Sequence, residues 1–178
     1  MSQLSLVQSA QRRQQAGFTL VELLLYLAVT SIIVTSVSGF FITMLEARVK
    51  FQVMSEVEQQ GAQVMQQMTQ TVRNGSTITS PTTGATGTGL TITVPTGALS
   101  PTIFDLSGGV IRVTEGAGAA EPLTNNRVTA SALSVQNLTR PTTQGVVRIQ
   151  FVITSVNGSG RNEFSFSKTF RGSATMRQ

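Results

Sequence analysis

The chain has no cysteine, no histidine and no tryptophan, and only 12% of its 178 residues are charged. Without cysteine and histidine it has no disulfides, thiol nucleophiles, histidine-dependent triads or Cys/His zinc sites. The lack of disulfides does not identify a compartment, because an exported protein can fold without them. Its serines have neither a histidine nor a plausible lysine base beside them. The sequence therefore predicts a protein that is not an enzyme and needs no cofactor.

The acidic residues do not predict metal binding either. Calcium requires a cage of roughly six to eight oxygens. The carboxylates of the C-terminal part stand too far apart in the sequence to predict such a cage: they belong to Asp105, Glu115, Glu121 and Glu163. No metal site is predicted.

Positive charge exceeds negative charge, with a net charge of +5 and a pI near 11.1. The basic residues of the C-terminal part stand singly, so nucleic acid is a partner that the charge permits but that no basic run supports. The one adjacent pair, Arg12 and Arg13, directly precedes a long apolar segment. Positive charge there holds a flank on the cytoplasmic side of a membrane. We therefore assign Arg12 and Arg13 to membrane topology.

The apolar segment covers residues 18–45 and contains a single charge, Glu22. A helix of this length extends about 42 Å, which exceeds the roughly 30 Å of a bilayer's hydrocarbon core. A secretory signal would place a cleavage site of small residues, such as Ala-x-Ala, after the apolar region, and no such site follows Leu45. The segment is therefore predicted to be a transmembrane helix, preceded by a leader of residues 1–17.

Residues 46–74 continue the helix as a soluble, amphipathic half. Apolar residues recur every three or four positions, as expected for one narrow helical stripe. They are Leu45, Val49, Val53, Val57, Val64 or Met65, Met68 and Val72. Gly61 occupies the stripe where another aliphatic residue is expected, which indicates a close approach or a local weakness. One helix is predicted from about residue 18 to residue 73, ended by Asn74 and Gly75, because both tolerate the left-handed conformation.

Residues 75–178 are rich in Thr, Ser, Gly and Pro and contain short runs typical of strands. The stretch 75–89 is predicted to be a loop or weak strand, and 90–94 alternates apolar and polar residues as a half-buried strand does. Hairpins are expected around 107–109 and 157–160, and the second should bring Phe164, Phe166 and Phe170 back on one face. The prediction is an α+β fold in which the helical stripe covers a small antiparallel sheet.

Residues 12–45 resemble the prepilin N-terminal motif of type IV pilins and type II secretion pseudopilins. A basic polar leader ends at Gly17, and Phe18-Thr19-Leu20-Val21-Glu22 opens the long apolar helix. The resemblance implies that a membrane peptidase cuts between Gly17 and Phe18 and that the new amine of Phe18 is methylated. It also implies anchoring in the cytoplasmic membrane, with the C-terminal domain exported, followed by assembly into an extracellular or periplasmic filament.

Glu22 is the residue on which an assembly role depends. A charged side chain inside a membrane helix costs about 2.5 to 3.5 kcal/mol on insertion scales, so a lone carboxylate calls for a partner. Cleavage would create one, because the amine of Phe18 on a staggered neighbouring subunit could reach it. The plainer interpretation is that Glu22 extends to the interface of a simple anchor, and that Gly17 is an ordinary flexible residue before a helix.

Two features frequent in major pilins are missing, namely a proline that kinks the apolar segment and a C-terminal cysteine pair. The resemblance therefore favours a minor pilin or pseudopilin, closest to the J class. Its expected partners are other pilin or pseudopilin subunits, the prepilin peptidase and methylase, the inner-membrane assembly platform and the lipid bilayer. The alternative function is a minor pilin that binds DNA or a surface as an adhesin.

Overall fold

The computed structural model describes residues 17–158 and 160–177. Arg12, Arg13 and all of the predicted leader except Gly17 therefore lie outside the described residues. The chain divides into two compact units, one ending at Met44 and the other running from Leu45 to Gln178.

Helix α1 runs from Leu20 to Asn74, which confirms the prediction of one uninterrupted helix. The predicted stop is correct, but the reason given for it is wrong, because neither Asn74 nor Gly75 has a positive φ. A side chain at position 75 would instead overlap Ile92 of the β-rich part. Glycine is therefore required at this helix end by close packing and not by a left-handed turn.

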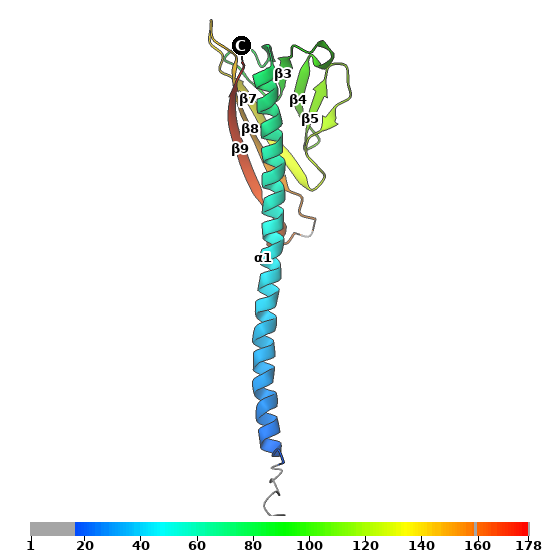
Figure 1. Cartoon of the computed structure of the whole chain (residues 1–178), viewed down its shortest axis with the longest axis vertical. Helices are drawn as coiled ribbons and strands as arrows, with labels where there is room; N and C mark the ends of the chain where they lie inside the picture. The colour runs from blue at the N-terminus through cyan, green and yellow to red at the C-terminus, as the bar shows by residue number, and fades with distance from the viewer. Residues whose placement is uncertain (1–16, 159, 178) are drawn as a thin grey trace, which may run out of the picture. The chain divides into compact units, whose positions relative to one another are not determined.

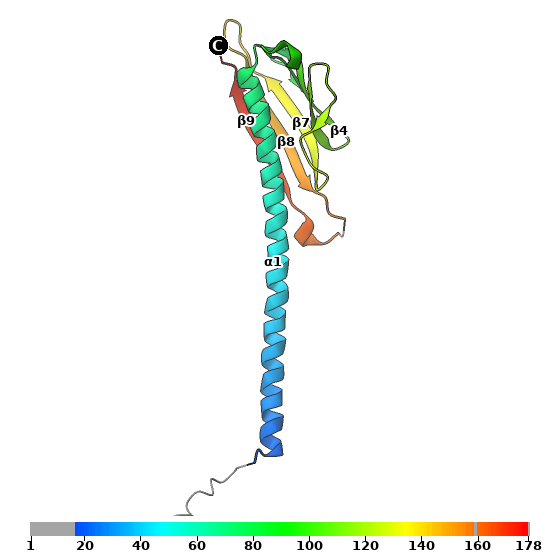
Figure 2. The same ribbon diagram turned by 45° about the vertical axis from the view of Figure 1, so that its right-hand side comes forward.

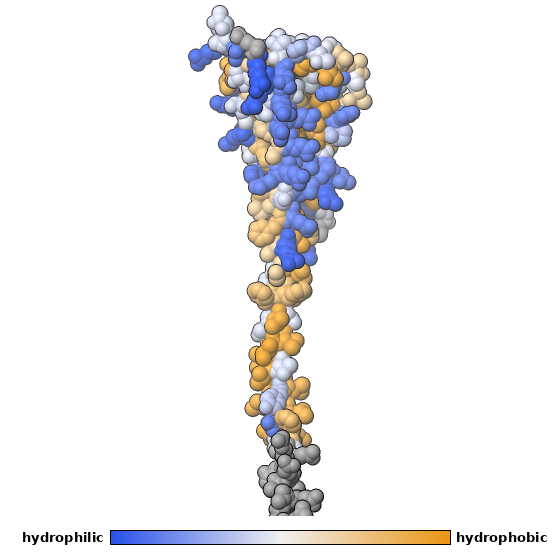
Figure 3. Space-filling view, viewed as in Figure 1, coloured by the Kyte–Doolittle hydropathy of each residue, from blue (hydrophilic) through white to orange (hydrophobic). Residues whose placement is uncertain are grey.

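In the N-terminal unit the helix is almost entirely apolar. Among the described residues, α1 is the one helix long and apolar enough to cross a membrane. Figure 3 shows apolar side chains along the visible face of this part of the helix. Their exposure is the feature that any account of this unit must explain.

Five antiparallel strands form the first sheet of the C-terminal unit, in the order β1-β3-β4-β5-β6. Their bounds are β1 Thr77–Ser80, β3 Leu90–Thr93, β4 Thr102–Ser107, β5 Val110–Glu115 and β6 Glu121–Pro122. The predicted β4–β5 hairpin is confirmed, and its turn places Gly108 and Gly109 at φ 59° and 80°. Across the hairpin, Arg112 donates two hydrogen bonds to Asp105, at 2.9 and 2.7 Å, which raise the pKa of the guanidinium.

Four antiparallel strands form the second sheet, in the order β2-β7-β8-β9. Their bounds are β2 Thr86–Gly87, β7 Val128–Asn137, β8 Val146–Ser155 and β9 Ser167–Thr175. The prediction of one small sheet is therefore wrong: there are two, and the segment 75–89 supplies one strand to each. The final hairpin is confirmed, but Phe164 lies in the short 3-10 turn η2 (Asn162–Phe164) and Phe166 precedes β9. A second 3-10 turn, η1, covers Gly97–Leu99.

One hydrophobic core joins the C-terminal half of α1 to both sheets. Figure 1 shows this half of the helix beside β8 and β9, and the turned view of Figure 2 shows β7, β8 and β9 as neighbours in one layer. Val64, Met68 and Val72 of the helix are fully buried with Phe104 of the first sheet and Phe151 of the second. Burying each such side chain stabilises the fold by about 1.5 to 3 kcal/mol.

The predicted stripe is buried only over part of its length. Val57, Gly61, Val64, Met68 and Val72 are buried. Val49 and Val53 are only half-buried, and Leu45 remains 47% exposed. The prediction that the sheet covers the stripe is therefore right from Val57 onward. The combination of a long apolar helix and antiparallel sheets confirms the α+β, pilin-like fold class.

Candidate processing and assembly site

The start of α1 is fixed by Thr19. Its side-chain Oγ1 accepts a hydrogen bond from the backbone N–H of Glu22 at 3.2 Å, and its carbonyl accepts one from Leu23 at 3.1 Å. These contacts make Thr19 the N-cap: its carbonyl accepts the first intrahelical hydrogen bond, and its side chain occupies the N–H of Glu22, which the first turn would otherwise leave free. The sequence analysis did not identify this role. The signal was present, since Thr19 and Glu22 have the Thr-x-x-Glu spacing of a capping box.

Gly17, Phe18 and Thr19 precede the helix and are exposed, without regular secondary structure. A Cβ built on Gly17 would meet no atom within 4 Å, and its φ is not left-handed. The fold of the described residues therefore makes no demand for glycine at position 17. If this position requires glycine, the requirement comes from a protein that acts on it.

Phe18, Glu22 and Tyr26 lie on one face of the helix start, four residues apart. The Tyr26 hydroxyl donates a hydrogen bond to Glu22 Oε1 at 3.5 Å. The rings of Phe18 and Tyr26 meet edge to face, with centroids 6.3 Å apart and planes 70° apart. Side chains at this spacing are neighbours on a helix surface, so the structure brings the two predicted residues Phe18 and Glu22 together beside Tyr26.

The Glu22 carboxylate has no cationic partner among the described residues. Its position in the first helical turn is favourable, because the helix N-terminus carries partial positive charge. A neutral tyrosine hydroxyl and a helix dipole do not neutralise a full charge. The site can therefore still take up a cationic group that approaches Phe18 and Glu22 from outside this chain.

Large apolar side chains around this site are exposed to an unusual degree. Phe18 is 74% exposed, Val21 72% and Phe40 71%. An apolar surface that extends over a whole helix is typical of membrane contact or of an interface with other proteins. Gly39, near the end of the apolar segment, also has open space where a side chain would be.

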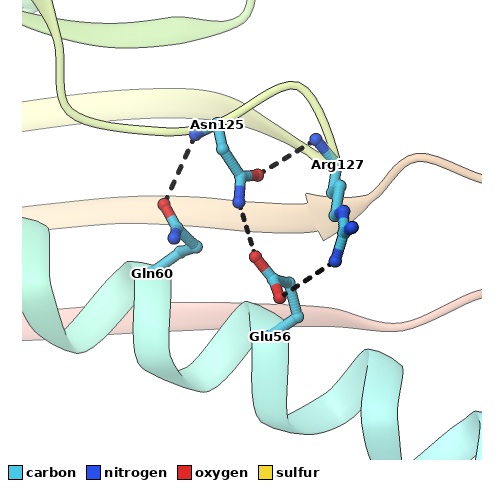
Figure 4. A network of polar contacts seen from close by, with 4 residues as sticks. All are labelled: Glu56, Gln60, Asn125 and Arg127. Atoms are coloured by element: carbon cyan, nitrogen blue, oxygen red, sulfur yellow. Dashed lines mark hydrogen bonds and ion pairs between the residues drawn. The ribbon is translucent and has the colours of Figure 1, made fainter.

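A second polar cluster, on the C-terminal half of α1, was missed by the sequence analysis (Figure 4). Asn125 Nδ2 donates to Glu56 Oε1 at 2.5 Å, and the backbone N–H of Asn125 donates to Gln60 Oε1 at 3.4 Å. Arg127 donates its backbone N–H to Asn125 Oδ1 at 3.0 Å, and its guanidinium lies 4.0 Å from Glu56. The network attaches the loop before β7 to the helix. In the sequence, this network is indicated only by the helical spacing of Glu56 and Gln60 beside the stripe.

Below this network lies an open hollow of about 570 Å³ between α1 and the ends of β7 and β8. Its apolar wall includes Val49, Val53 and Phe164, and Glu56 and Arg127 stand at its polar rim. The hollow explains why the first part of the stripe is only half-buried, since the sheets end before they reach it. Nothing in its lining groups catalytic side chains, and in the described part of the chain no three acidic residues come together as a metal site.

Comparison with known proteins bears on the N-terminal part. Residues 12–38 match a family model described as the prokaryotic N-terminal methylation motif. No curated protein and no solved structure matches the chain. The matched range contains Gly17, Phe18 and Glu22, and members of this family are structural proteins rather than enzymes. Through this motif and its apolar N-terminal helix, the N-terminal part of the chain is similar to prepilins of the type IV pilin and pseudopilin family.

Proposed function

We propose that the chain is a minor structural subunit of a type IV pilus or of a type II secretion-like pseudopilus. The observation that carries the proposal is the matched motif, in which Glu22 is the lone charge of an exposed apolar helix and shares a face with Phe18. Residues 1–17 are the leader and 18–45 the transmembrane segment. Residues 46–74 are the soluble half of the helix, and 75–178 form the exported β-rich domain.

Processing takes place between Gly17 and Phe18. Both residues are exposed and lie outside regular structure, as a peptidase requires of the backbone that it cuts. Glycine places no side chain in the way. The methylated amine of Phe18 then becomes the first group of the mature helix, while Arg12 and Arg13 hold the leader on the cytoplasmic side until it is removed.

Assembly depends on Glu22. Within one chain the backbone nitrogen of Phe18 lies about 6 Å along the helix axis from the level of Glu22, at 1.5 Å per residue. The amine of a staggered neighbour can therefore pair with a carboxylate that its own chain leaves without a cation. A minor, J-class-like role is favoured by the absence of proline from the apolar segment and by the absence of cysteine. The partners are other pilin subunits, the peptidase and methylase, and the assembly platform of the inner membrane.

Mass spectrometry of the chain extracted from membranes tests this proposal. In a host with its cognate peptidase, we expect a protein that begins at methylated Phe18, and Gly17→Val should leave the full-length precursor. Gly39→Val is the matched control, because both glycines have open space around them and only Gly17 borders the cut. An intact Met1 in the unaltered chain, or a cut beyond Leu45, would exclude the proposal.

A further inference from the structure

A few charged side chains of the C-terminal unit form no ion pair in the described structure. Of the eight acidic residues in the chain, five form ion pairs: Glu46, Glu56, Glu58, Asp105 and Glu163. Glu22 belongs to the membrane segment. The two that remain are Glu115 and Glu121, whose side chains are exposed and have no ion pair or hydrogen bond in the described structure.

Glu115 and Glu121 are neighbours at the edge of the five-stranded sheet. Glu121 of β6 pairs with Val113 of β5, and Glu115 lies two positions further along β5. The two carboxylates are therefore diagonal neighbours on one face, with Cα atoms about 7 to 8 Å apart. Like charges at such positions repel each other, so this edge of the sheet is a small anionic surface with no cation to balance it.

An opposite pair lies on the four-stranded sheet, on the face turned away from the core. Arg148 of β8 pairs with Ser173 of β9, and Arg171 of β9 pairs with Gln150 of β8. The two arginines are thus diagonal neighbours as well, while Ile149, between Arg148 and Gln150, is buried in the core. Together with Gln150, Gly172 and Ser173 they line a shallow hollow of about 450 Å³.

Within residues 17–158 and 160–177, no carboxylate forms an ion pair with this cationic surface. Arg171 Nε donates to Gln150 Oε1 at 3.0 Å, which holds the guanidinium in place without neutralising it. The residues paired with Arg148 are Gln136 and Ser173, both uncharged. The face thus presents two guanidinium groups, a type of group that matches carboxylate geometry well.

We propose that Arg148 and Arg171 of one copy of this chain bind Glu115 and Glu121 of a second copy. The two surfaces have the same number of charges, opposite signs and similar spacing, and each is repulsive on its own. They lie on different sheets of the same chain, so the contact is heterologous and can join two copies that stand side by side. The inference rests on the proposed function, since it names a lateral contact between exported domains of subunits anchored side by side.

Nucleic acid fits the cationic face less well. The residues of the hollow include no aromatic side chain on which a base could stack, and two arginines make a small footprint for a polyanion. Two carboxylates at matching spacing satisfy the same two arginines fully. The second copy is therefore the occupant that the charges favour.

Cross-linking in cells that assemble the unaltered chain tests the contact. Because the chain has no cysteine, introduced cysteines give no background. Ser173→Cys places a thiol at the cationic surface, and Ala119→Cys places one in the loop between Glu115 and Glu121. With a short bismaleimide, the chain carrying both cysteines should form cross-linked dimers. Each single-cysteine chain should remain monomeric.

Charge exchange tests whether electrostatics hold the contact. Arg171→Glu places like charges opposite each other and should lower the yield of cross-linked dimer about tenfold. Glu121→Arg combined with Arg171→Glu restores opposite charges and should recover most of that yield. Arg177→Glu is the matched control, because it makes the same change of charge outside β9 and should leave the yield unchanged.

Three results would overturn the inference. The first is an absence of dimers while the unaltered chain is found in sheared filaments, which would leave the proposed filament role intact. The second is a cross-link to a different protein. The third is tight, salt-sensitive binding of a DNA duplex by the detergent-solubilised chain that Arg171→Glu abolishes, which would make the face a nucleic-acid surface.

Discussion

At Gly61 the helix and β9 touch more closely than any side chain would allow. A Cβ at this position would overlap the ring of Phe170, which stacks on Phe151 with centroids 5.5 Å apart and planes 19° apart. Lys168 lies over the same ring at 5.5 Å, and its amino group also bonds Glu58 of the helix at 2.6 Å. The ring is therefore held from two sides, and glycine is the residue that makes room for it.

Gly61→Val should lower the free energy of unfolding by about 2 kcal/mol, because valine must push Phe170 off its stack. Thermal or denaturant unfolding of the detergent-solubilised chain, followed by circular dichroism, measures this loss. Gly97→Val is the control, since position 97 has open space, and its effect should stay within about 0.5 kcal/mol.

A double-mutant cycle with Phe170→Ala separates overpacking from a general loss of helix stability. If the ring is the cause, adding Phe170→Ala should make Gly61→Val much less harmful than it is alone. Equal effects of Gly61→Val with and without the ring would contradict this explanation.

Three single residues show what could be predicted from the sequence and what could not. Gly61 was predictable as an irregularity, because it interrupts a regular stripe, and the structure shows that of the two interpretations the close approach is correct. Gly75 was predictable as a helix end but not for its reason, since its neighbour Ile92 lies in β3 and its neighbour Met176 follows the distant strand β9. Thr19 could have been found from spacing alone, because its partner Glu22 is only three residues away.

Among the elements, the loop before β7 depends most on long-range polar contacts. Asn125 joins it to the helix across 69 residues of sequence, through Glu56, and the ion pair of Arg127 adds little at 4.0 Å. Hydrogen bonds to charged groups are worth more than neutral ones. Asn125 is therefore the residue that fixes this loop.

Asn125→Ala should reduce stability by about 1 to 3 kcal/mol, because it leaves a half-buried carboxylate without its donor. Hydrogen exchange should show faster exchange in residues 123–127 and little change in β8. Asn126→Ala is the matched control, being the exposed neighbour that makes none of these bonds. Equal losses for the two variants would mean that the network contributes nothing specific.

Strands were easier to predict than sheets. Alternation identified 90–94, the β4–β5 hairpin and the final hairpin, because side-chain period is a local property. The division into two sheets was not predictable in the same way. It depends on β1 and β2, short strands of the stretch 75–89 that pair with different partners, β3 and β7. Such pairings are set by distant strands rather than by the residues themselves.

Taken as a whole molecule, the chain concentrates its buried core in residues 57–176 and its exposed apolar surface before residue 46. The core residues of the helix, from Val57 to Val72, all lie beyond the apolar segment. Among the described residues, removal of 1–45 therefore takes away no fully buried side chain. The sequence predicted this asymmetry, because one helix carries a continuous apolar run followed by a narrow stripe.

A chain lacking residues 1–45 should accordingly be soluble and folded. We expect mixed helical and β circular dichroism, cooperative unfolding and a monomer by sedimentation. A shorter chain that begins at residue 64 lacks Val57 and Gly61, which are buried in the intact domain, and should therefore be unfolded. This second truncation provides the contrast. A disordered spectrum for the first truncation would contradict the boundary at residue 45.

The carboxylate of Glu22 should affect membrane insertion and filament assembly in different ways. Glu22 costs about 2.5 to 3.5 kcal/mol in a bilayer, so Glu22→Ala should insert at least as well as the unaltered chain. If the carboxylate pairs with the amine of a neighbour's Phe18, incorporation into sheared filaments should fall at the same time. If Glu22 served only as an anchor residue, its replacement would not lower filament incorporation while membrane insertion stayed the same or improved.

Glu22→Gln is the sharper variant, because it keeps the size of the side chain and an acceptor for the Tyr26 hydroxyl but removes the charge. Tyr26→Phe is its counterpart, since it removes the hydroxyl and keeps both the charge and the ring beside Phe18. We expect Glu22→Gln to abolish most filament incorporation and Tyr26→Phe to have a smaller effect, with processing at Phe18 checked for each. Normal incorporation of Glu22→Gln would reduce Glu22 to an interfacial residue. Equal losses of filament incorporation in both variants would assign the effect to the Glu22–Tyr26 hydrogen bond. A loss of incorporation in Glu22→Gln alone is the result that only an intermolecular charge pair produces.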